Sequence, residues 1–307
     1  MKLSVMIPTY NRPETLELCL GGLARQKRSA DQVVVVVRPD DTASLSALKP
    51  WLQTLPITTV FVDQPGVVQA LNKGLAEVTG DIITITDDDS VAYADWLARI
   101  EEHFARDARL GGLGGRDVVH AEGKIIPASA HLVGRILPFG RIVGNHHIGL
   151  GDVREVDVLK GVNMSWRMDA IQGRHFDTGF RGKGAQVFFE LGFSLEIKGT
   201  GWRLMYDPAL TVDHFPARRF DNDQRGAPSL DALEDATFNL YLALLRNIQS
   251  SWRVRAAIAW ARVFGTRSSP GAVRGWLSRI KRDRHGLLVR GTAINAWKDA
   301  KVAAEKQ

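Results

Sequence analysis

The sequence predicts an α/β fold: a doubly wound, mixed but mostly parallel sheet with helices on both faces, followed by a basic helical extension at the C-terminus. Three observations support this prediction. Short apolar runs alternate with segments of helical spacing up to residue 89. Residues 33–37 are five valines, which is typical of a strand covered on both faces. Residues 246–290 carry eleven Lys or Arg against one acid, Asp283.

The elements of the first third follow in order. Residues 3–7 form an apolar run closed by Pro8, which predicts a strand, and residues 14–26 have leucines at helical spacing. We then expect the strand 33–37, a helix over 43–55, a strand over 59–62, a helix over 67–78 and a strand over 82–86. Strands separated by helices of this length form right-handed crossover units, and hence a doubly wound sheet.

The rest of the chain is less regular. Residues 111–160 are rich in glycine, and we expect loops and short strands there. Helices are expected over residues 229–249, 251–264 and 270–282. The basic residues therefore belong to this last part of the chain, and the net charge of +6 says little about the predicted sheet.

Composition narrows the class of protein. An apolar content of 45% is that of an ordinary globular chain. The single cysteine, Cys19, lies in an apolar pattern, which favours a buried structural thiol and excludes a disulfide framework. The first residues lack the length and cleavage site of a signal peptide, and no stretch of about 18 uncharged apolar residues occurs. We therefore expect a cytoplasmic protein.

Three consecutive carboxylates, Asp87, Asp88 and Asp89, end the expected strand 82–86. Adjacent side chains at a strand end point in alternate directions, so Asp87 and Asp89 can converge on one cation while Asp88 faces elsewhere. So much negative charge is costly unless a positive group is present, and a divalent metal holding a diphosphate provides one. The alternative is an acidic loop in solvent.

Four polar segments follow the expected strands at the edge where such sheets bind ligands: residues 8–12, 38–41, 63–66 and 87–89. The chain has no GxGxxG after its first strand and no GxxxxGK[ST]. Neither a dinucleotide fingerprint nor a P-loop therefore explains the crevice that these segments would form.

These motifs resemble the inverting, family 2 glycosyltransferases of GT-A fold. The opening SVMIPTYNRPETLELCLGGL resembles their first strand and donor-binding turn, and LNKGLAEVTGDIITITDDDS resembles their metal-binding DxD strand end. The later segments GVNMSWRMDAI, FDTGF and GWRLMYDPALTVDHF match the second half in order and spacing, so the resemblance covers about residues 2–220.

The resemblance implies roles for particular residues. Asp87, Asp89 and His214 would hold Mn²⁺ or Mg²⁺ on the diphosphate, and a nitrogen ligand beside two carboxylates suits Mn²⁺ at least as well as Mg²⁺. His214 could also be a surface histidine after a strand, and Lys73 could equally be solvated. The residues expected to bind the nucleotide sugar are Pro8, Thr9, Tyr10, Arg12, Asp40, Lys73 and Asp88.

The chain departs from the family pattern at two places. Arg38 stands where an aspartate usually reads the base, with Asp40 and Asp41 displaced after it, so the base is left open. The family's Glu-Asp pair, whose second member is the catalytic base, aligns with Phe189 and Glu190. Glu190 lies among aromatic residues, which disfavour the charged carboxylate and suit a general base. An exposed helix face, or an ion pair with Lys183 or Arg181, is the alternative.

The expected function is therefore metal-dependent, inverting transfer of a sugar from a nucleoside diphosphate to an acceptor hydroxyl, in cell-surface polysaccharide or glycolipid synthesis. Residues 1–228 would form the transferase domain, with a nucleotide-binding half (1–110) and an acceptor-binding half (111–228), and residues 229–307 the extension. A nucleotidyltransferase is disfavoured because the N-terminal glycine-rich loop is missing. A non-catalytic protein that binds nucleotide sugars or assembles partners at a membrane remains the alternative.

The extension carries apolar residues at helical spacing with arginines on other faces, the pattern of helices that lie in a membrane interface. The two stripes are Trp252, Ala256, Trp260 and Val263, and Val273, Trp276, Leu277 and Ile280. We expect peripheral contact with the inner face of the plasma membrane and a carbohydrate or lipid-linked acceptor. Packing on the catalytic domain or on a second copy of the chain is the alternative. No groove-reading motif accompanies the charge, so nucleic acid is not expected.

Overall fold

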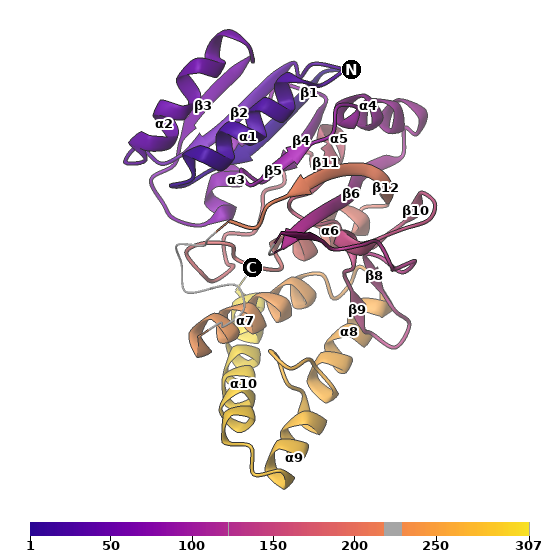
Figure 1. The fold of residues 1–307 in the computed structure, drawn as a ribbon. Coiled ribbons are helices and arrows are strands. Elements are labelled where there is room, and N and C mark those ends of the chain that lie inside the picture. Colours follow the sequence, from indigo (N-terminus) through magenta and orange to yellow (C-terminus); the bar gives the residue numbers. More distant parts are fainter. Residues whose placement is uncertain (122, 218–228, 307) are drawn as a thin grey trace.

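A computed structural model of the chain describes residues 1–121, 123–217 and 229–306. Its centre is a ten-stranded mixed sheet in which eight strands lie in the order β10-β12-β6-β11-β4-β1-β2-β3 (Figure 1). Helices cover both faces of the sheet, and the C-terminal helices lie together at one end of the molecule (Figure 1). The fold class expected from the sequence is confirmed.

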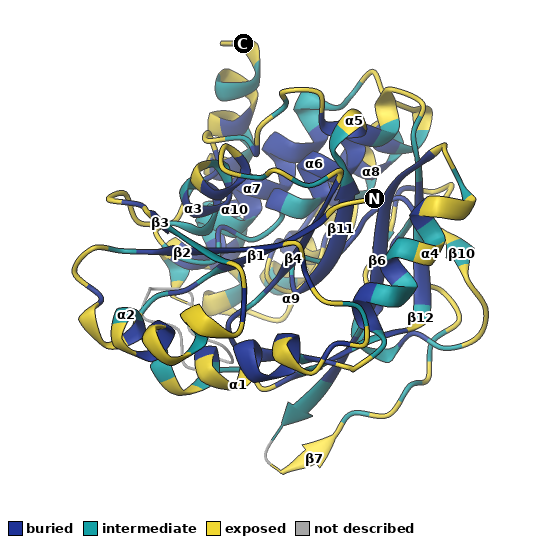
Figure 2. Ribbon diagram, turned by 90° about the horizontal axis from the view of Figure 1, so that it is seen from above, coloured by how far each residue is buried: buried dark blue, intermediate teal, exposed yellow. Residues whose placement is uncertain are grey.

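The parallel part of the sheet comes from the first third of the chain, as expected. Its strands are short and apolar, and the run of valines in β2 is buried along its whole length. The elements are β1 (Leu3–Pro8), α1 (Pro13–Ala24), β2 (Gln32–Val37), α2 (Thr42–Leu48), η1 (Lys49–Gln53), β3 (Ile57–Phe61), α3 (Val67–Leu75) and β4 (Ile82–Thr86). Figure 2 shows the sheet mostly buried and the outer faces of α1 and α2 exposed, so these helices bury only one side.

The second half adds antiparallel strands to the same sheet. β11 pairs antiparallel with both β4 and β6, and β12 then runs parallel to β6. These elements, with the smaller ones around them, are β5 (Ser90–Ala92), α4 (Trp96–Arg106), β6 (Leu110–Ala121), β7 (Lys124–Ile125), β8 (Arg135–Ile136), β9 (Ile142–Val143), η2 (His146–Ile148), β10 (Arg154–Glu155), β11 (Asn163–Arg167), α5 (Met168–Ile171), α6 (Phe189–Gly199) and β12 (Arg203–His214).

The expectation of only loops and short strands over residues 111–160 is wrong at its start, where β6 is a long, central strand. Its glycines are there because the neighbouring side chains and backbone leave no room for a Cβ atom. A Cβ on Gly111 would lie 2.6 Å from the Trp202 side chain, and one on Gly115 would lie 1.9 Å from the Leu210 carbonyl oxygen. The glycines therefore allow close approach of neighbouring elements rather than flexibility.

Four helices follow, one more than expected: α7 (Leu230–Arg246), α8 (Trp252–Val263), α9 (Ala272–Ile280) and α10 (Arg284–Glu305). α10 packs along α7, with Trp297 edge-on against Tyr241 at a centroid distance of 4.9 Å. Residues of α7 and α8, among them Leu244 and Ile258, belong to the same buried cluster as the sheet residues Met6 and Ile85. The extension thus shares a core with the sheet.

Candidate active site

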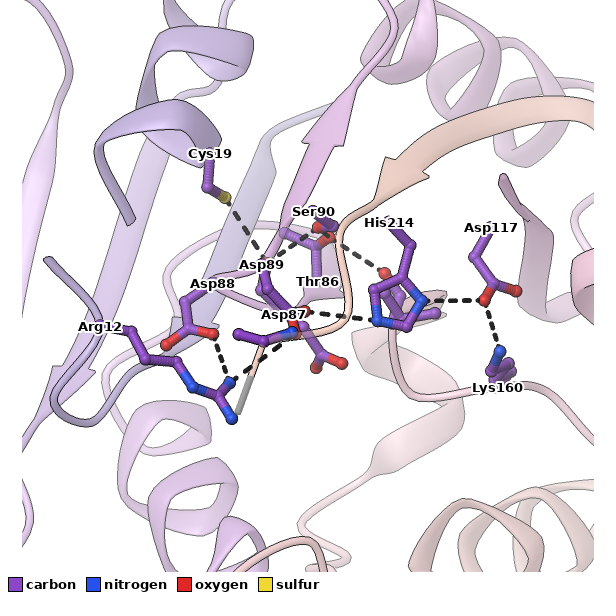
Figure 3. A network of polar contacts seen from close by, with 12 residues as sticks. Arg12, Cys19, Thr86, Asp87, Asp88, Asp89, Ser90, Asp117, Lys160 and His214 are labelled. Atoms are coloured by element: carbon purple, nitrogen blue, oxygen red, sulfur yellow. Dashed lines mark hydrogen bonds and ion pairs between the residues drawn. The ribbon is translucent and has the colours of Figure 1, made fainter. Parts of the chain in front are cut away.

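The acidic triplet lies directly after β4, at the carboxyl edge of the parallel strands. Asp88 and Asp89 are each only 2% exposed, so the triplet is not an acidic loop in solvent. The side chains alternate as expected for a strand end: Asp88 faces Arg12, whereas Asp87 and Asp89 face His214 (Figure 3). The triplet therefore divides into one carboxylate that binds protein groups and two that converge.

Asp87, Asp89 and His214 form the one cluster of potential metal ligands among residues 1–121, 123–217 and 229–306. One ligand atom from each residue lies within 4.8 Å of the others. His214 ends β12, and the antiparallel pairing of β12 with β5 places His214 opposite Ser90, the residue after the triplet. Residues more than a hundred positions apart in sequence are thus brought together by the register of two strands.

His214 is also held by a further carboxylate, Asp117, which no motif in the sequence indicates. Its Nδ1 lies 3.2 Å from Oδ2 of Asp117, which is fully buried in β6 and also pairs with Lys160 (Figure 3). Burial opposes ionisation of Asp117, but the bond from His214 and the charge of Lys160 outweigh it and lower the pKa of this carboxyl. Because a carboxylate only accepts hydrogen bonds, Nδ1 of His214 carries the proton.

The remaining ring nitrogen of His214 points toward the two aspartates. Nε2 is buried, has no hydrogen-bond partner within the described chain, and lies 3.5 Å from Oδ1 of Asp89. With Nδ1 protonated, Nε2 presents a lone pair, the arrangement of metal-binding histidines whose other nitrogen is bound to a carboxylate. The donor set of two carboxylates and one imidazole therefore fits a divalent ion such as Mn²⁺ or Mg²⁺.

Ionisation of the buried aspartates in the triplet is unfavourable when no cation is bound. Burial, reinforced by the neighbouring Asp89, raises the pKa of Asp87. Burial also raises the pKa of Asp88 to about 7, although Arg12 opposes this. A cation between Asp87 and Asp89 would offset part of this cost.

The segment after β1 surrounds Asp88. Thr9 Oγ1 donates to Asp88 Oδ2 at 2.8 Å, and the Arg12 guanidinium donates to Oδ1 at 2.8 Å. Pro8, the last residue of β1, and Tyr10 are half-buried in the same turn. Arg12 also approaches Asp89 to 3.9 Å, so this turn places a fixed positive charge beside the cluster.

The segment after β2 contributes Asp41 rather than Asp40. Asp40 is exposed and pairs with Arg38, whose guanidinium lies over the Tyr10 ring at 4.8 Å. Asp41 is only 1% exposed, accepts from the Asn11 backbone N–H at 2.6 Å and caps α2. Asn11 has a φ of 53°, so Asp41 fixes an otherwise unfavourable turn. Nothing in the local sequence distinguishes Asp41 from Asp40 in this role.

Lys73 is exposed in the last turn of α3, the helix that precedes β4 and the acidic triplet. Its neighbour Asn72 exchanges two hydrogen bonds with the Phe176 backbone, at 2.7 and 2.8 Å, and is therefore occupied in joining the two halves of the sheet domain.

Glu190 lies in the first turn of α6, half-buried, on the wall of a cavity of about 380 Å³. Lys160, which pairs with Asp117, lines the same cavity. The cavity is thus connected to the metal-ligand cluster through Lys160, Asp117 and His214. Position in a helix first turn favours a carboxylate, and the flanking Phe188 and Leu191 keep part of its surroundings apolar.

The fold and this site define the class of GT-A-fold proteins, and comparisons with known proteins agree. The structure of S. aureus TarS (residues 1–349) with UDP-GlcNAc superposes with a TM-score of 0.66 at 15% identity, covering 98% of this chain and 80% of that one. The mannosyltransferase PcManGT of Pyrobaculum calidifontis with GDP-Man and Mn²⁺ gives a TM-score of 0.55 at 18% identity, covering 99% and 86%. At these identities the likeness shows the fold.

Residues 4–152 match the family model described as glycosyl transferase family 2. The amylovoran biosynthesis glycosyltransferase AmsE of Erwinia amylovora is 36% identical over 92 residues, which are 29% of this chain and 35% of that protein. Just under half of the chain, residues 4–152, is therefore similar to glycosyl transferase family 2, and the region matched to AmsE spans about a third of the length of that relative.

Proposed function

We propose that this protein transfers a glycosyl group from a nucleoside diphosphate sugar to an acceptor hydroxyl with inversion, in cell-surface polysaccharide or glycolipid synthesis. The observation that supports this most directly is the convergence of Asp87, Asp89 and the unbonded Nε2 of His214 at the ligand-binding edge of the sheet. The match of residues 4–152 to the family model and the nucleotide sugars bound by TarS and PcManGT support the same donor class.

The donor would lie across the loops after β1, β2 and β4. Pro8, Thr9 and Tyr10 would line the nucleotide, with Asp40 and Lys73 at the exposed rim, and Asp88 would face the ribose or sugar. Arg12 would hold positive charge beside the diphosphate. When bound by Asp87, Asp89 and His214, Mn²⁺ or Mg²⁺ would neutralise charge on the diphosphate leaving group.

Glu190 would accept the proton of the acceptor hydroxyl. Its cavity is linked to the metal-ligand cluster through Lys160, which pairs with Asp117, and an acceptor bound there would attack the donor from the side opposite the departing diphosphate. The new bond then forms as the bond to the diphosphate breaks, and the configuration inverts. The apolar residues beside Glu190 would limit water and so disfavour hydrolysis of the donor.

The first test is a screen of nucleotide sugars by thermal denaturation with and without Mn²⁺. A specific donor should raise the melting temperature only when the metal is present, because it stabilises the folded state by mass action. EDTA should remove the effect and excess Mn²⁺ should restore it. Stabilisation by a donor that persists in EDTA would contradict the proposed metal site.

The presence of Glu190 in a cavity favours transfer over the non-catalytic alternative, because a protein that only binds the donor needs no cavity with a carboxylate beside the donor site. A donor that binds but never yields a glycosylated product, over a panel of carbohydrate and lipid-linked acceptors, would support the binding protein instead.

We also propose that α8 and α9 contact an anionic membrane surface. Eleven of the twenty-one exposed large apolar residues among those the structure describes lie within residues 252–302. Trp276 is 62% exposed and Ile280 59%, and exposed arginines and lysines surround them. Tryptophan with basic residues suits the headgroup region of a bilayer. In the described chain no helix has the length and apolar character needed to cross a membrane.

Membrane contact is tested with the full chain, because α7 and α8 share a core with the sheet and truncation would expose it. Sedimentation with vesicles of phosphatidylglycerol and phosphatidylcholine is expected to fall at least tenfold for Trp276→Ser with Ile280→Ser. Exposed Leu18→Ser and Leu52→Ser on the sheet domain provide the matched control. If both double variants sediment like the wild type, the membrane proposal fails. Loss of self-association in the first variant, seen by analytical ultracentrifugation, would indicate a second copy of the chain instead.

A further inference from the structure

The cavity that contains Glu190 lies between the sheet domain and the C-terminal extension. One side is formed by residues 140–147 and 158–160 and by the start of α6, and the other by α7, α8 and Thr266. The volume of about 380 Å³ lies in the range of small-molecule sites. The two sides are in close contact beside the cavity: a Cβ on Gly140 would lie 2.0 Å from the Ala256 carbonyl oxygen of α8.

Apart from Thr266, the wall from the extension is apolar, and its shape depends on small residues. Ala257 and Ala261 are one turn apart on α8, 1% and 5% exposed, and both line the cavity beside Trp260. Positions i and i+4 of a helix share a face, so these two alanines leave open the space that Trp260 borders. Leu240 of α7 and Leu191 of α6 continue the same apolar surface.

The charged groups of the lining, Glu190 and Lys160, come from the sheet-domain side, as do His147 and Asn145, and Lys160 pairs with Asp117, the residue that holds His214. We call these four residues the polar end of the cavity and the extension side its apolar end; Ile142, Val158 and Leu159 add apolar contacts on the sheet-domain side. The cavity is therefore amphiphilic: the sheet-domain side supplies its charged groups, one of which pairs with Asp117 beside the metal-ligand cluster, and the extension side supplies an aromatic ring, a leucine and two alanines. A free sugar would leave the apolar end without a partner, and a plain hydrocarbon would leave the polar end unbonded.

We infer that this cavity takes an acceptor with both characters, a glycoside with an apolar aglycone, and that α8 selects it. The sugar would lie at the polar end with a hydroxyl against Glu190, and the aglycone would lie along Ala257, Trp260 and Ala261. The inference rests on the proposed function for the role of Glu190, but the binding of an amphiphilic glycoside to this cavity can be measured separately.

The probe is n-octyl β-D-glucopyranoside below its micellar concentration, compared with D-glucose by titration calorimetry. We expect the wild type to bind the alkyl glycoside at least tenfold more tightly than glucose. Ala261→Phe should weaken binding of the alkyl glycoside at least tenfold because the ring fills the apolar end. The matched control is Ala259→Phe, the same change on the exposed face of the same helix, which should bind as the wild type does.

Because Ala261 also packs against α7 and α10, Ile142→Trp fills the cavity from the opposite wall as a second variant. Mn²⁺ binding reports that each variant is folded. Equal affinity of the alkyl glycoside for the wild type, Ala261→Phe and Ile142→Trp overturns the inference, even if the protein binds donor and metal. Failure of the wild type to bind any donor with Mn²⁺ would instead contradict the proposed function. The calorimetric comparison of the variants would still decide whether the cavity binds the alkyl glycoside.

Discussion

Asp117 and His214 lie on neighbouring parallel strands, β6 and β12, with 3.2 Å between the aspartate oxygen and the imidazole Nδ1. Neither residue is more than 7% exposed. This contact fixes which nitrogen of His214 carries a proton, and so which nitrogen can bind a metal. Asp117 is thus a positioning residue for the ligand cluster. No motif lies near it in the sequence, so its role could be found only from the structure.

The first prediction concerns this contact. Asp117→Asn keeps the shape of the side chain but removes the charge that holds Nδ1–H, so Mn²⁺ affinity should fall by about 10 to 100-fold. The measurement is the free Mn²⁺ signal in electron paramagnetic resonance during a titration. Asp213→Asn is the control, since Asp213 lies on β12 beside His214 but pairs with His120 at 2.8 Å. Unaltered Mn²⁺ affinity in Asp117→Asn would show that the contact has no positioning role.

The second prediction concerns proton transfer. Glu190→Gln preserves size and hydrogen bonding but cannot accept the proton, so kcat should fall by roughly 10² to 10⁴-fold. Donor binding with Mn²⁺, measured by calorimetry, should be unchanged. Glu196→Gln on the same helix, where Glu196 pairs with Arg174, is the control and should retain activity. Full activity of Glu190→Gln would remove Glu190 from the mechanism.

The third prediction is a loss of stability in acid through His146. Burial lowers the pKa of His146 to about 4, against the ordinary value of 6.5, and its Nε2 donates to the Val158 carbonyl at 2.9 Å. Between these two values the unfolded chain binds a proton that the folded chain does not, so the free energy of unfolding falls as the pH is lowered from 6.5 to about 4. The contribution reaches roughly 3 kcal/mol.

Urea denaturation of the wild type and His146→Gln at several pH values measures this contribution. The difference in unfolding free energy between the two proteins should shrink as the pH falls, because only the wild type loses the stability that comes from the lowered pKa of His146. A difference that stays constant from pH 7 to pH 4.5 would show that His146 does not carry the acid sensitivity.

The fourth prediction concerns the glycines of β6. A Cβ on Gly115 would lie 1.9 Å from the Leu210 carbonyl oxygen, so Gly115→Ala should destabilise the protein by about 1 to 3 kcal/mol. Nothing lies within 4 Å of a Cβ on Gly144, and Gly144→Ala should be neutral or slightly stabilising. Both values come from chemical denaturation. Equal stability of the two variants would show that the close contact between Gly115 and Leu210 does not constrain the residue at position 115.

The sequence predicts the structure best where a short local pattern is enough to decide where a segment lies in the fold. The apolar runs of β1, β2 and β4 are strands because they are buried on both faces, and the acidic triplet directly after β4 was found from that position alone. The link from the triplet to His214 came through the family resemblance, since nothing near His214 predicts that β12 pairs with β5.

Other features depend on contacts that leave no local signal. The glycines of β6 indicate loops by composition, yet they are placed by Trp202 and Leu210, which follow far along the chain. Because β6 was not expected, Asp117 could not be seen as a neighbour of His214. Asp41 and Asp40 look equivalent in sequence, and only the turn at Asn11 shows that Asp41 is the buried one.

The position of α8 against the sheet domain would place recognition of the acceptor and recognition of the donor in different parts of the chain. The loops that would hold the sugar nucleotide come from the N-terminal third of the chain, whereas α8 comes from its last fifth. Replacing α8 with the corresponding helix of a related glycosyltransferase should therefore change which alcohol is glycosylated while the sugar that is consumed stays the same, which makes this helix a suitable place to engineer acceptor preference.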